Sequence, residues 1–211
     1  MKSVIGEDYM AKLRFRYATM ESGKSAEILQ VNYNYNKIGR KGLLLIPELD
    51  KVSNGEVSSR LGISAPAIKI KQSDNLYELV KNKLKNENIS YVILDEANFI
   101  TTEQADQLGD IVDFLKIDVM AYGLLTDFRT NLFGGSARLV AIQDELEEIS
   151  VKSICHCGKK ANCNARIIDN QIVKEGEQIV LDSKDGKNHE IQYVPLCRKC
   201  FKLGKWQANN L

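Results

Sequence analysis

One short stretch of the sequence places a glycine, a lysine and a serine in the order used by phosphate-binding loops. Residues 18–25 read Ala-Thr-Met-Glu-Ser-Gly-Lys-Ser, which is close to the pattern G-x-x-x-x-G-K-[ST]. Gly23 permits a tight turn in which backbone amides point inward and donate to phosphate oxygens. Lys24 would add a mobile positive charge at the β- and γ-phosphates, and the Ser25 hydroxyl could ligate Mg²⁺. The stretch therefore predicts a site for a nucleoside triphosphate with its Mg²⁺.

Two positions of this loop depart from the pattern. Ala18 stands where a glycine is usual, and Glu21 puts a carboxylate among groups that should attract anions. A chance turn is the alternative interpretation. The flanking segments favour the phosphate loop, because the apolar pattern indicates a strand over residues 11–18 and a helix over residues 24–37. The residues expected to line the nucleotide site are Ala18, Thr19, Met20, Glu21, Ser22, Gly23, Lys24 and Ser25.

Two acids follow a short apolar run further along the chain. Residues 91–94 read Tyr-Val-Ile-Leu, typical of a buried strand, and Asp95 and Glu96 come directly after them. A phosphate-loop fold needs an acidic group at the end of a neighbouring strand to hold the Mg²⁺ shell, and Asp95 is the candidate. Glu96 could accept the proton of an acceptor hydroxyl as a general base. The alternative is an acidic loop that merely faces solvent.

All five cysteines lie after residue 150, and four of them form two close pairs. The pairs are Cys155 with Cys157 and Cys197 with Cys200. Brought together, two such pairs give the tetrahedral four-sulfur site that Zn²⁺ prefers, with no open coordination position for catalysis. A structural Zn²⁺ site is therefore predicted. A reactive dithiol, unrelated free thiols, or His156 in place of one cysteine are the alternatives, and Cys163 is interpreted as a core residue.

The order of apolar segments predicts an α/β fold. Expected strands cover residues 11–18, 42–47, 67–70, 91–94 and 118–124, and expected helices carry the apolar positions of residues 24–37, 76–84 and 105–115. Ser73-Asp74 is the candidate cap of the second helix, and Thr101-Thr102 precede the third. Strands separated by helices indicate a parallel sheet covered on both faces. After about residue 150 the chain turns to short polar segments. We expect a tail over 1–10, a nucleotide-binding domain over 11–150 and a metal-binding domain over 151–211.

Composition restricts the classes of partner. The 211 residues carry a net charge of only +1, which gives no indication of a nucleic-acid-binding surface. No apolar run approaches the length of about 18 residues that a membrane-spanning helix needs, and the first residues do not form a secretory signal. We expect a cytoplasmic protein that binds neither nucleic acid nor membrane.

Several further segments stand in an order that carries a family resemblance. They are Val-Ser-Ser-Arg-Leu-Gly at 57–62, Asp-Glu-Ala-Asn-Phe at 95–99, Tyr-Gly-Leu at 122–124, Thr-Asp-Phe-Arg at 126–129, Ile-Cys-His-Cys-Gly at 154–158, Glu-Gly-Glu-Gln at 175–178 and Cys-Arg-Lys-Cys at 197–200. Together with the phosphate loop they resemble the zinc-containing type II thymidine kinases, the cellular and bacterial kind. The resemblance runs over nearly the whole chain, and the ordered set is far more specific than any one segment.

The resemblance implies a RecA-like P-loop domain with a parallel central sheet, followed by a small zinc-stapled lobe. A long loop of that lobe, the lasso, would close over the nucleoside. The implied activity is transfer of the γ-phosphoryl group of ATP to the 5′-hydroxyl of thymidine, for salvage of DNA precursors. ATP with Mg²⁺ held at Ser25 and Asp95, a structural Zn²⁺, a homotetramer and feedback inhibition by thymidine triphosphate are implied as well.

The resemblance also assigns roles to residues. Glu96 would be the catalytic proton acceptor, and Asp95 and Asn98 would serve the nucleotide and its Mg²⁺. Aromatic side chains would wall the thymine pocket, because a flat base suits flat contact surfaces. The residues implied on the substrate side are Phe99, Phe128, Phe133 and Tyr193, with Gln178, Ile179, Val180 and Leu181 of the lasso reading the base edge.

Some positions differ from the family's usual residues, and other functions stay open. Asn98 replaces a glutamine, Val52 an arginine and Val173 a tyrosine, and Leu181-Asp182-Ser183 with the insertion 184–190 alters the lasso. These differences bear on thymidine selectivity more than on phosphoryl transfer. The alternatives are a P-loop ATPase with water as acceptor, a non-catalytic nucleotide-binding, zinc-stabilised interaction protein, and a kinase for another nucleoside such as deoxyuridine.

Overall fold

A six-stranded parallel sheet forms the centre of the molecule. The computed structural model describes residues 10–49, 55–178 and 191–207. The strands lie in the order β5-β2-β6-β7-β1-β8, and every neighbouring pair is parallel. Their bounds are Leu13–Tyr17 (β1), Gly42–Pro47 (β2), Ile68–Ile70 (β5), Tyr91–Leu94 (β6), Asp118–Gly123 (β7) and Glu145–Glu148 (β8). The predicted α/β class with a parallel sheet is confirmed.

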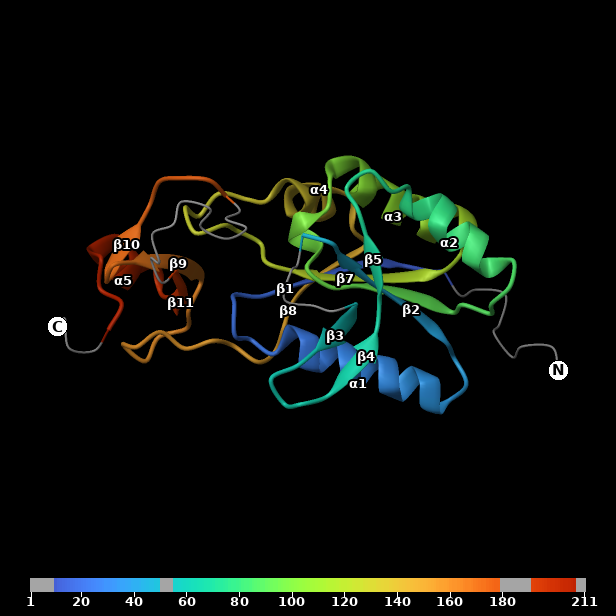
Figure 1. Ribbon diagram of the computed structural model, residues 1–211, viewed down its shortest axis with the longest axis horizontal. Helices are drawn as coiled ribbons and strands as arrows, with labels where there is room; N and C mark the ends of the chain where they lie inside the picture. The colour runs from blue at the N-terminus through green and yellow to red at the C-terminus, as the bar shows by residue number, and fades with distance from the viewer. Residues whose placement is uncertain (1–9, 50–54, 179–190, 208–211) are drawn as a thin grey trace.

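Helices cover both faces of this sheet (Figure 1). They are α1 (Lys24–Lys37), α2 (Leu76–Leu84), α3 (Thr102–Leu115) and α4 (Gly134–Ile142), and a 3-10 turn, η1 (Ala97–Phe99), precedes α3. Side chains of α2, α3 and α4 share one buried cluster with Leu45, whereas α1 shares another with Leu44. Adjacent residues of a strand point to opposite faces, so β2 contributes to both layers. Among the described helices, none is long and apolar enough to cross a membrane.

Polar side chains cap the starts of α2 and α3. Thr101, which the sequence places just before the helix, caps α3 in a reciprocal capping box with Gln104. The start of α2 was predicted one or two residues too early, at Ser73 and Asp74. Asn75 is the cap, because it has extended backbone angles and its Oδ1 accepts from the Glu78 amide at 2.9 Å.

Four elements of the larger lobe were not foreseen. The hairpin of β3 (Glu56–Ser58) and β4 (Ser64–Pro66) lies beside α1, and α4 and β8 follow β7. Strand β8 reads Glu-Leu-Glu-Glu, with no buried residue and little apolar alternation. It was missed because it has no buried apolar residue: backbone pairing with β1 places it at the sheet edge, and side-chain ion pairs reinforce it there.

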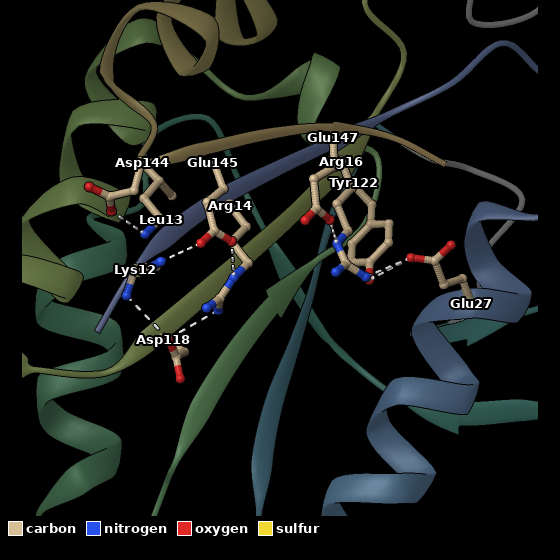
Figure 2. A network of polar contacts seen from close by, with 10 residues as sticks. All are labelled: Lys12, Leu13, Arg14, Arg16, Glu27, Asp118, Tyr122, Asp144, Glu145 and Glu147. Atoms are coloured by element: carbon tan, nitrogen blue, oxygen red, sulfur yellow. Dashed lines mark hydrogen bonds and ion pairs between the residues drawn. The ribbon is translucent and has the colours of Figure 1, made fainter. Parts of the chain in front are cut away.

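Figure 2 shows these pairs between β1 and β8. Arg14 Nε lies 2.7 Å from Glu145 Oε2, and Lys12 pairs with the other oxygen of the same carboxylate. Hydrogen bonds from Lys12, and next from Arg14, lower the pKa of Glu145 below its ordinary value. The Leu13 amide donates to Asp144 Oδ2 at 2.7 Å. These polar contacts help to fix the register in which the edge strand pairs with β1.

The same network ties the end of β1 to the start of α1 (Figure 2). Arg16 contacts Glu27 at 2.7 Å through Nη1 and Glu147 at 2.7 Å through Nε. The Tyr122 hydroxyl lies 3.1 Å from Arg16 Nη1, and burial raises its pKa well above the ordinary value, so it stays protonated. Because Arg16 precedes and Glu27 follows the loop at residues 18–23, this contact fixes the two ends of that loop.

A second, smaller antiparallel sheet forms the C-terminal lobe, drawn at the left of Figure 1. It contains β9 (Cys163–Ile168), β10 (Gln171–Val173) and β11 (Gln192–Leu196) in the order β10-β9-β11, followed by α5 (Arg198–Leu203). Phe201 and Trp206 pack in a core separate from those of the large sheet, together with Cys155, Cys163, Cys197 and Cys200. The place of Cys163 agrees with its interpretation as a core residue. The domain limits at residues 10 and 150 stay a prediction.

Candidate active site

The loop between β1 and α1 has the backbone that a phosphate cradle needs. Gly23 is in the left-handed region, at φ 79° and ψ 19°, directly before the first residue of α1. Lys24 is buried, and its Nζ lies 3.4 Å from the carbonyl oxygen of Thr19, so the side chain folds back over the loop. The Ala18 amide donates to Gly123 O at 3.3 Å, which attaches the loop to the end of β7.

The carboxylate of Glu21 is directed away from the loop. Glu21 has a left-handed backbone, at φ 62°, and its Oε1 lies 2.9 Å from Nη1 of Arg60 in the β3–β4 hairpin. The pair is solvent-exposed and therefore adds little stability. It nevertheless removes the objection that a carboxylate in this loop would repel phosphate.

Ser22 offers a further sign of a ligand. Its Oγ is buried and has no hydrogen-bond partner among the described residues. A buried hydroxyl without a partner is costly, and such groups in native structures usually serve a ligand or ordered water. A phosphate oxygen in the loop is a suitable partner.

The acidic pair lies at the same sheet edge as the loop. Strands β1 and β6 are separated only by β7, and all three are parallel, so their carboxyl ends coincide. Ser25 Oγ donates to Asp95 Oδ2 at 3.2 Å, while Asp95 Oδ1 accepts from the Glu96 amide at 2.9 Å. The hydroxyl and the carboxylate expected around Mg²⁺ are thus in direct contact.

Glu96 has an unusual backbone for its residue type. It lies in the left-handed region, at φ 49° and ψ 41°, and begins the η1 turn. Such a conformation in a residue other than glycine costs on the order of 1–3 kcal/mol and persists only where its surroundings impose it. Its side chain is half-buried. Strain of this kind clusters at functional sites, which agrees with the role expected for Glu96.

Two glycines let the surrounding backbone approach this turn directly. A Cβ on Gly123 would lie 2.9 Å from both the amide nitrogen and Oδ1 of Asn98. A Cβ on Gly135, in the first turn of α4, would lie 2.7 Å from the carbonyl oxygen of Ile100 and 2.9 Å from that of Ala97. The turn that carries Glu96 is therefore clamped between β7 and α4.

Asn98 belongs to this clamp. Its Oδ1 accepts from the Leu124 amide at 2.9 Å, which joins η1 to the end of β7. Its Nδ2 is buried with no partner in the described part of the chain, so one donor stays available. The expected contact of Asn98 with the nucleotide stays a prediction.

The aromatic side chains expected around thymine form two groups. Phe99 and Phe133 meet edge to face, with ring centroids 5.9 Å apart. Phe128 is buried beneath the guanidinium of Arg166, which also hydrogen-bonds the Tyr193 hydroxyl at 2.9 Å. Gln178 Nε2 donates to Asp127 Oδ2 at 3.1 Å, beside Phe128. Ile179, Val180 and Leu181 lie outside the described residues, as do Val52 and residues 182–190.

The four paired cysteines converge in the small lobe. The sulfurs of Cys155, Cys157, Cys197 and Cys200 all lie within 4.8 Å of one another. The Cys157 sulfur is 3.6 Å from that of Cys155 and 3.7 Å from that of Cys197. Tetrahedral Zn²⁺ with Zn–S distances of about 2.3 Å separates its sulfurs by about 3.8 Å, so the cluster fits this metal. His156 is not among the residues whose ligand atoms gather there, and its Nε2 lies 3.2 Å from Lys205 O.

Comparison with known proteins agrees with this geometry. Residues 11–201 match the family model described as thymidine kinase. The thymidine kinase of Francisella tularensis is 43% identical over 199 residues, covering 94% of this chain and 100% of that protein. That of Legionella pneumophila is 46% identical over 199 residues, with coverages of 93% and 91%. The chain belongs to the thymidine kinase family.

Two polar residues beside the phosphate loop belong to no recognisable motif, and the sequence did not predict them. Asn164 of β9 accepts from the Met20 amide at 2.8 Å and donates to Thr126 O at 3.3 Å. Ser153 Oγ donates to the Met20 carbonyl at 2.5 Å. The small lobe thus holds the middle of the phosphate loop. Single polar residues without characteristic spacing give no signal from which sequence reasoning could have found them.

The packing of α4 against the η1 turn can be tested at two adjacent glycines in the first turn of α4. Gly135→Ala should lower the free energy of unfolding by about 1–3 kcal/mol, because its methyl group would overlap two carbonyl oxygens of the η1 segment. Turnover should fall with it, since the same turn carries Glu96. Urea unfolding and steady-state kinetics measure the two effects.

Gly134→Ala is the matched control, because a Cβ there meets nothing within 4 Å. It should behave like the parent chain. Equal stability and turnover in both variants would show that backbone contact does not position the turn.

Proposed function

We propose that this chain transfers the γ-phosphoryl group of ATP to the 5′-hydroxyl of thymidine and releases thymidine monophosphate and ADP. The observation that carries the proposal is the 3.2 Å contact of Ser25 with Asp95, which joins the phosphate loop to the acidic turn. The family supports thymidine as acceptor, since the relatives are named thymidine kinases. That naming disfavours an ATPase or a non-catalytic nucleotide-binding protein.

Residues 18–25 would hold the triphosphate. Backbone amides and the positive end of α1 face the phosphates, Lys24 supplies a charge already folded over the loop, and Ser22 has a donor to spare. Ser25 and Asp95 would hold Mg²⁺, whose charge neutralises the transferred group. Most of the rate acceleration is expected from this electrostatic stabilisation.

Glu96 would act on the acceptor. Its carboxylate takes the 5′-hydroxyl proton while that oxygen forms a bond to the γ-phosphorus and the bond to the ADP oxygen breaks. The packing around η1 holds Glu96 in its left-handed backbone conformation. Asn98, within this turn, would assist at the nucleotide.

The thymine base would be held on the aromatic side of the site. Phe99 and Phe133 form one wall, and Phe128 with Tyr193 another. Gln178, with Ile179, Val180 and Leu181, would supply main-chain contacts to the base edge. The contact of Gln178 with Asp127 supports this placement, because it holds the start of that segment beside Phe128.

Further properties of the family are proposed for this chain. Cys155, Cys157, Cys197 and Cys200 would hold one structural Zn²⁺, a homotetramer would form, and thymidine triphosphate would inhibit. A cytoplasmic location is proposed as well, since the described cysteines form no disulfide, as a reducing compartment favours. A metal-binding domain over 151–211 would follow the kinase domain over 11–150.

The role of Glu96 is tested by Glu96→Gln, which keeps the shape of the side chain and removes the base. With radiolabelled thymidine and ATP-Mg²⁺, kcat should fall by about 10²–10⁴ while the KM for ATP stays near that of the parent. Glu103→Gln on α3 makes the same change at an exposed position and should leave kcat unchanged. Parent-like turnover of Glu96→Gln would refute the assignment.

The cysteine cluster is tested by metal analysis. The purified chain should contain about one Zn²⁺, and Cys157→Ser should lose most of it and lower the melting temperature, because three sulfurs bind Zn²⁺ less well than four. Cys163→Ala removes the fifth cysteine, whose sulfur is not among the four, and should keep the metal. Equal Zn²⁺ contents in the two variants would contradict the four-sulfur site.

A further inference from the structure

Arg166 is a buried cation at the centre of the small sheet. It lies on the middle strand β9, opposite Val173 of β10 and Tyr193 of β11, and is 2% exposed. Its guanidinium donates to the Tyr193 hydroxyl at 2.9 Å, Glu177 O at 2.9 Å and Gln178 O at 3.1 Å. Each nitrogen of the guanidinium therefore has its own acceptor.

The flat face of the same group covers an aromatic ring. The guanidinium carbon of Arg166 lies 3.6 Å from the ring centroid of Phe128, close enough for full stacking. Phe128 belongs to the segment after β7, on the other lobe. One side chain thus contacts the Phe128 segment, the main chain at 177–178 and Tyr193 at once.

The charge of Arg166 is costly where it lies. All three of its acceptors are uncharged, and no ion pair with a carboxylate is found for it in the described part of the chain. Burying a cation against neutral acceptors brings a desolvation cost that apolar residues would avoid. Its place is better explained by the geometry that it imposes on its neighbours than by stability.

Neighbouring contacts hold the same segments together. Arg129 Nη1 donates to Gly176 O at 3.2 Å, and Arg129 is itself paired with the buried carboxylate of Asp127 at 3.0 Å. Asp127 also accepts from Gln178 Nε2. Gly176 and Gln178 are therefore attached to Arg129 and Asp127, the two sequence neighbours of Phe128, while Arg166 covers Phe128 itself.

We propose that Arg166 is a positioning residue for the nucleoside base. It sets the ring plane of Phe128, the Tyr193 hydroxyl and the carbonyls at 177–178 in one arrangement, so that the base finds a preformed surface. The inference rests on the proposed function, which places Phe128 and Tyr193 at the base. The hydrogen bonds and the ring contact of Arg166 among the described residues involve neither the phosphate loop nor the acidic turn, so the nucleoside side alone should respond to its loss.

Arg166→Lys is the decisive variant. Lysine keeps the charge but has a single nitrogen, which cannot serve three separated acceptors or stack on a ring. The KM for thymidine should rise about 10- to 100-fold, the range expected for loss of charge-assisted hydrogen bonds. The KM for ATP and kcat at saturating thymidine should stay within about threefold of the parent, a split that general destabilisation would not produce.

Arg138→Lys is the matched control. Arg138 on α4 forms an exposed pair with Asp106 at 2.6 Å and should leave all three constants unchanged. Melting temperature and Zn²⁺ content of each variant show that the small lobe stays folded. Should Arg166→Lys not fold, Tyr193→Phe takes its place, because it removes one acceptor of the guanidinium and keeps the ring.

The outcomes separate this inference from the proposed function. A raised KM for thymidine with ATP constants unchanged supports it. An unchanged KM for thymidine, or an equal rise for ATP, overturns it while leaving the kinase assignment in place. A parent chain that forms no thymidine monophosphate in the same assay overturns the proposed function and this inference with it.

Discussion

The parallel alignment of β1, β7 and β6 is the constraint on which the site depends. Parallel strands end at one sheet edge, so the loop after β1 meets the acids after β6 although 70 positions separate Ser25 from Asp95. Neighbouring strands lie about 4.8 Å apart, which puts β1 and β6 about 10 Å from each other with β7 between them. The turn at Gly23 and the side chain of Ser25 bridge that gap. A triphosphate bound in the loop would thereby face the acidic turn.

The small lobe contributes to the site as well as to the fold. Asn164 and Ser153 bond both backbone groups of Met20, in the middle of the phosphate loop. Arg166 of the same lobe covers Phe128, on the substrate side. A metal ion bound by the four cysteines would therefore influence phosphoryl transfer indirectly, because it would stabilise the lobe whose strand β9 supplies Asn164 and Arg166.

Close backbone packing explains how a strained residue persists at the centre of the site. Glu96 occupies a left-handed conformation that its side chain disfavours. Gly123 and Gly135 allow β7 and α4 to approach the η1 turn at distances that no Cβ would permit. The contacts that result outweigh the local cost, and they hold Glu96 beside Asp95 without any direct bond between their side chains being required.

The sequence by itself determined those parts whose chemistry is local: the Gly-Lys-Ser turn, the apolar run before Asp95 and the spacing of the cysteines. Backbone conformation, strand burial and metal ligation follow from residue type and near neighbours. Tertiary structure alone decided that Glu21 turns outward to Arg60 and that β8 lies beside β1, linked to it by an ion pair of Arg14 with Glu145. It also brought Arg166 onto Phe128. These contacts join segments far apart in the chain. No local pattern encodes which side chain meets which partner once the chain has folded.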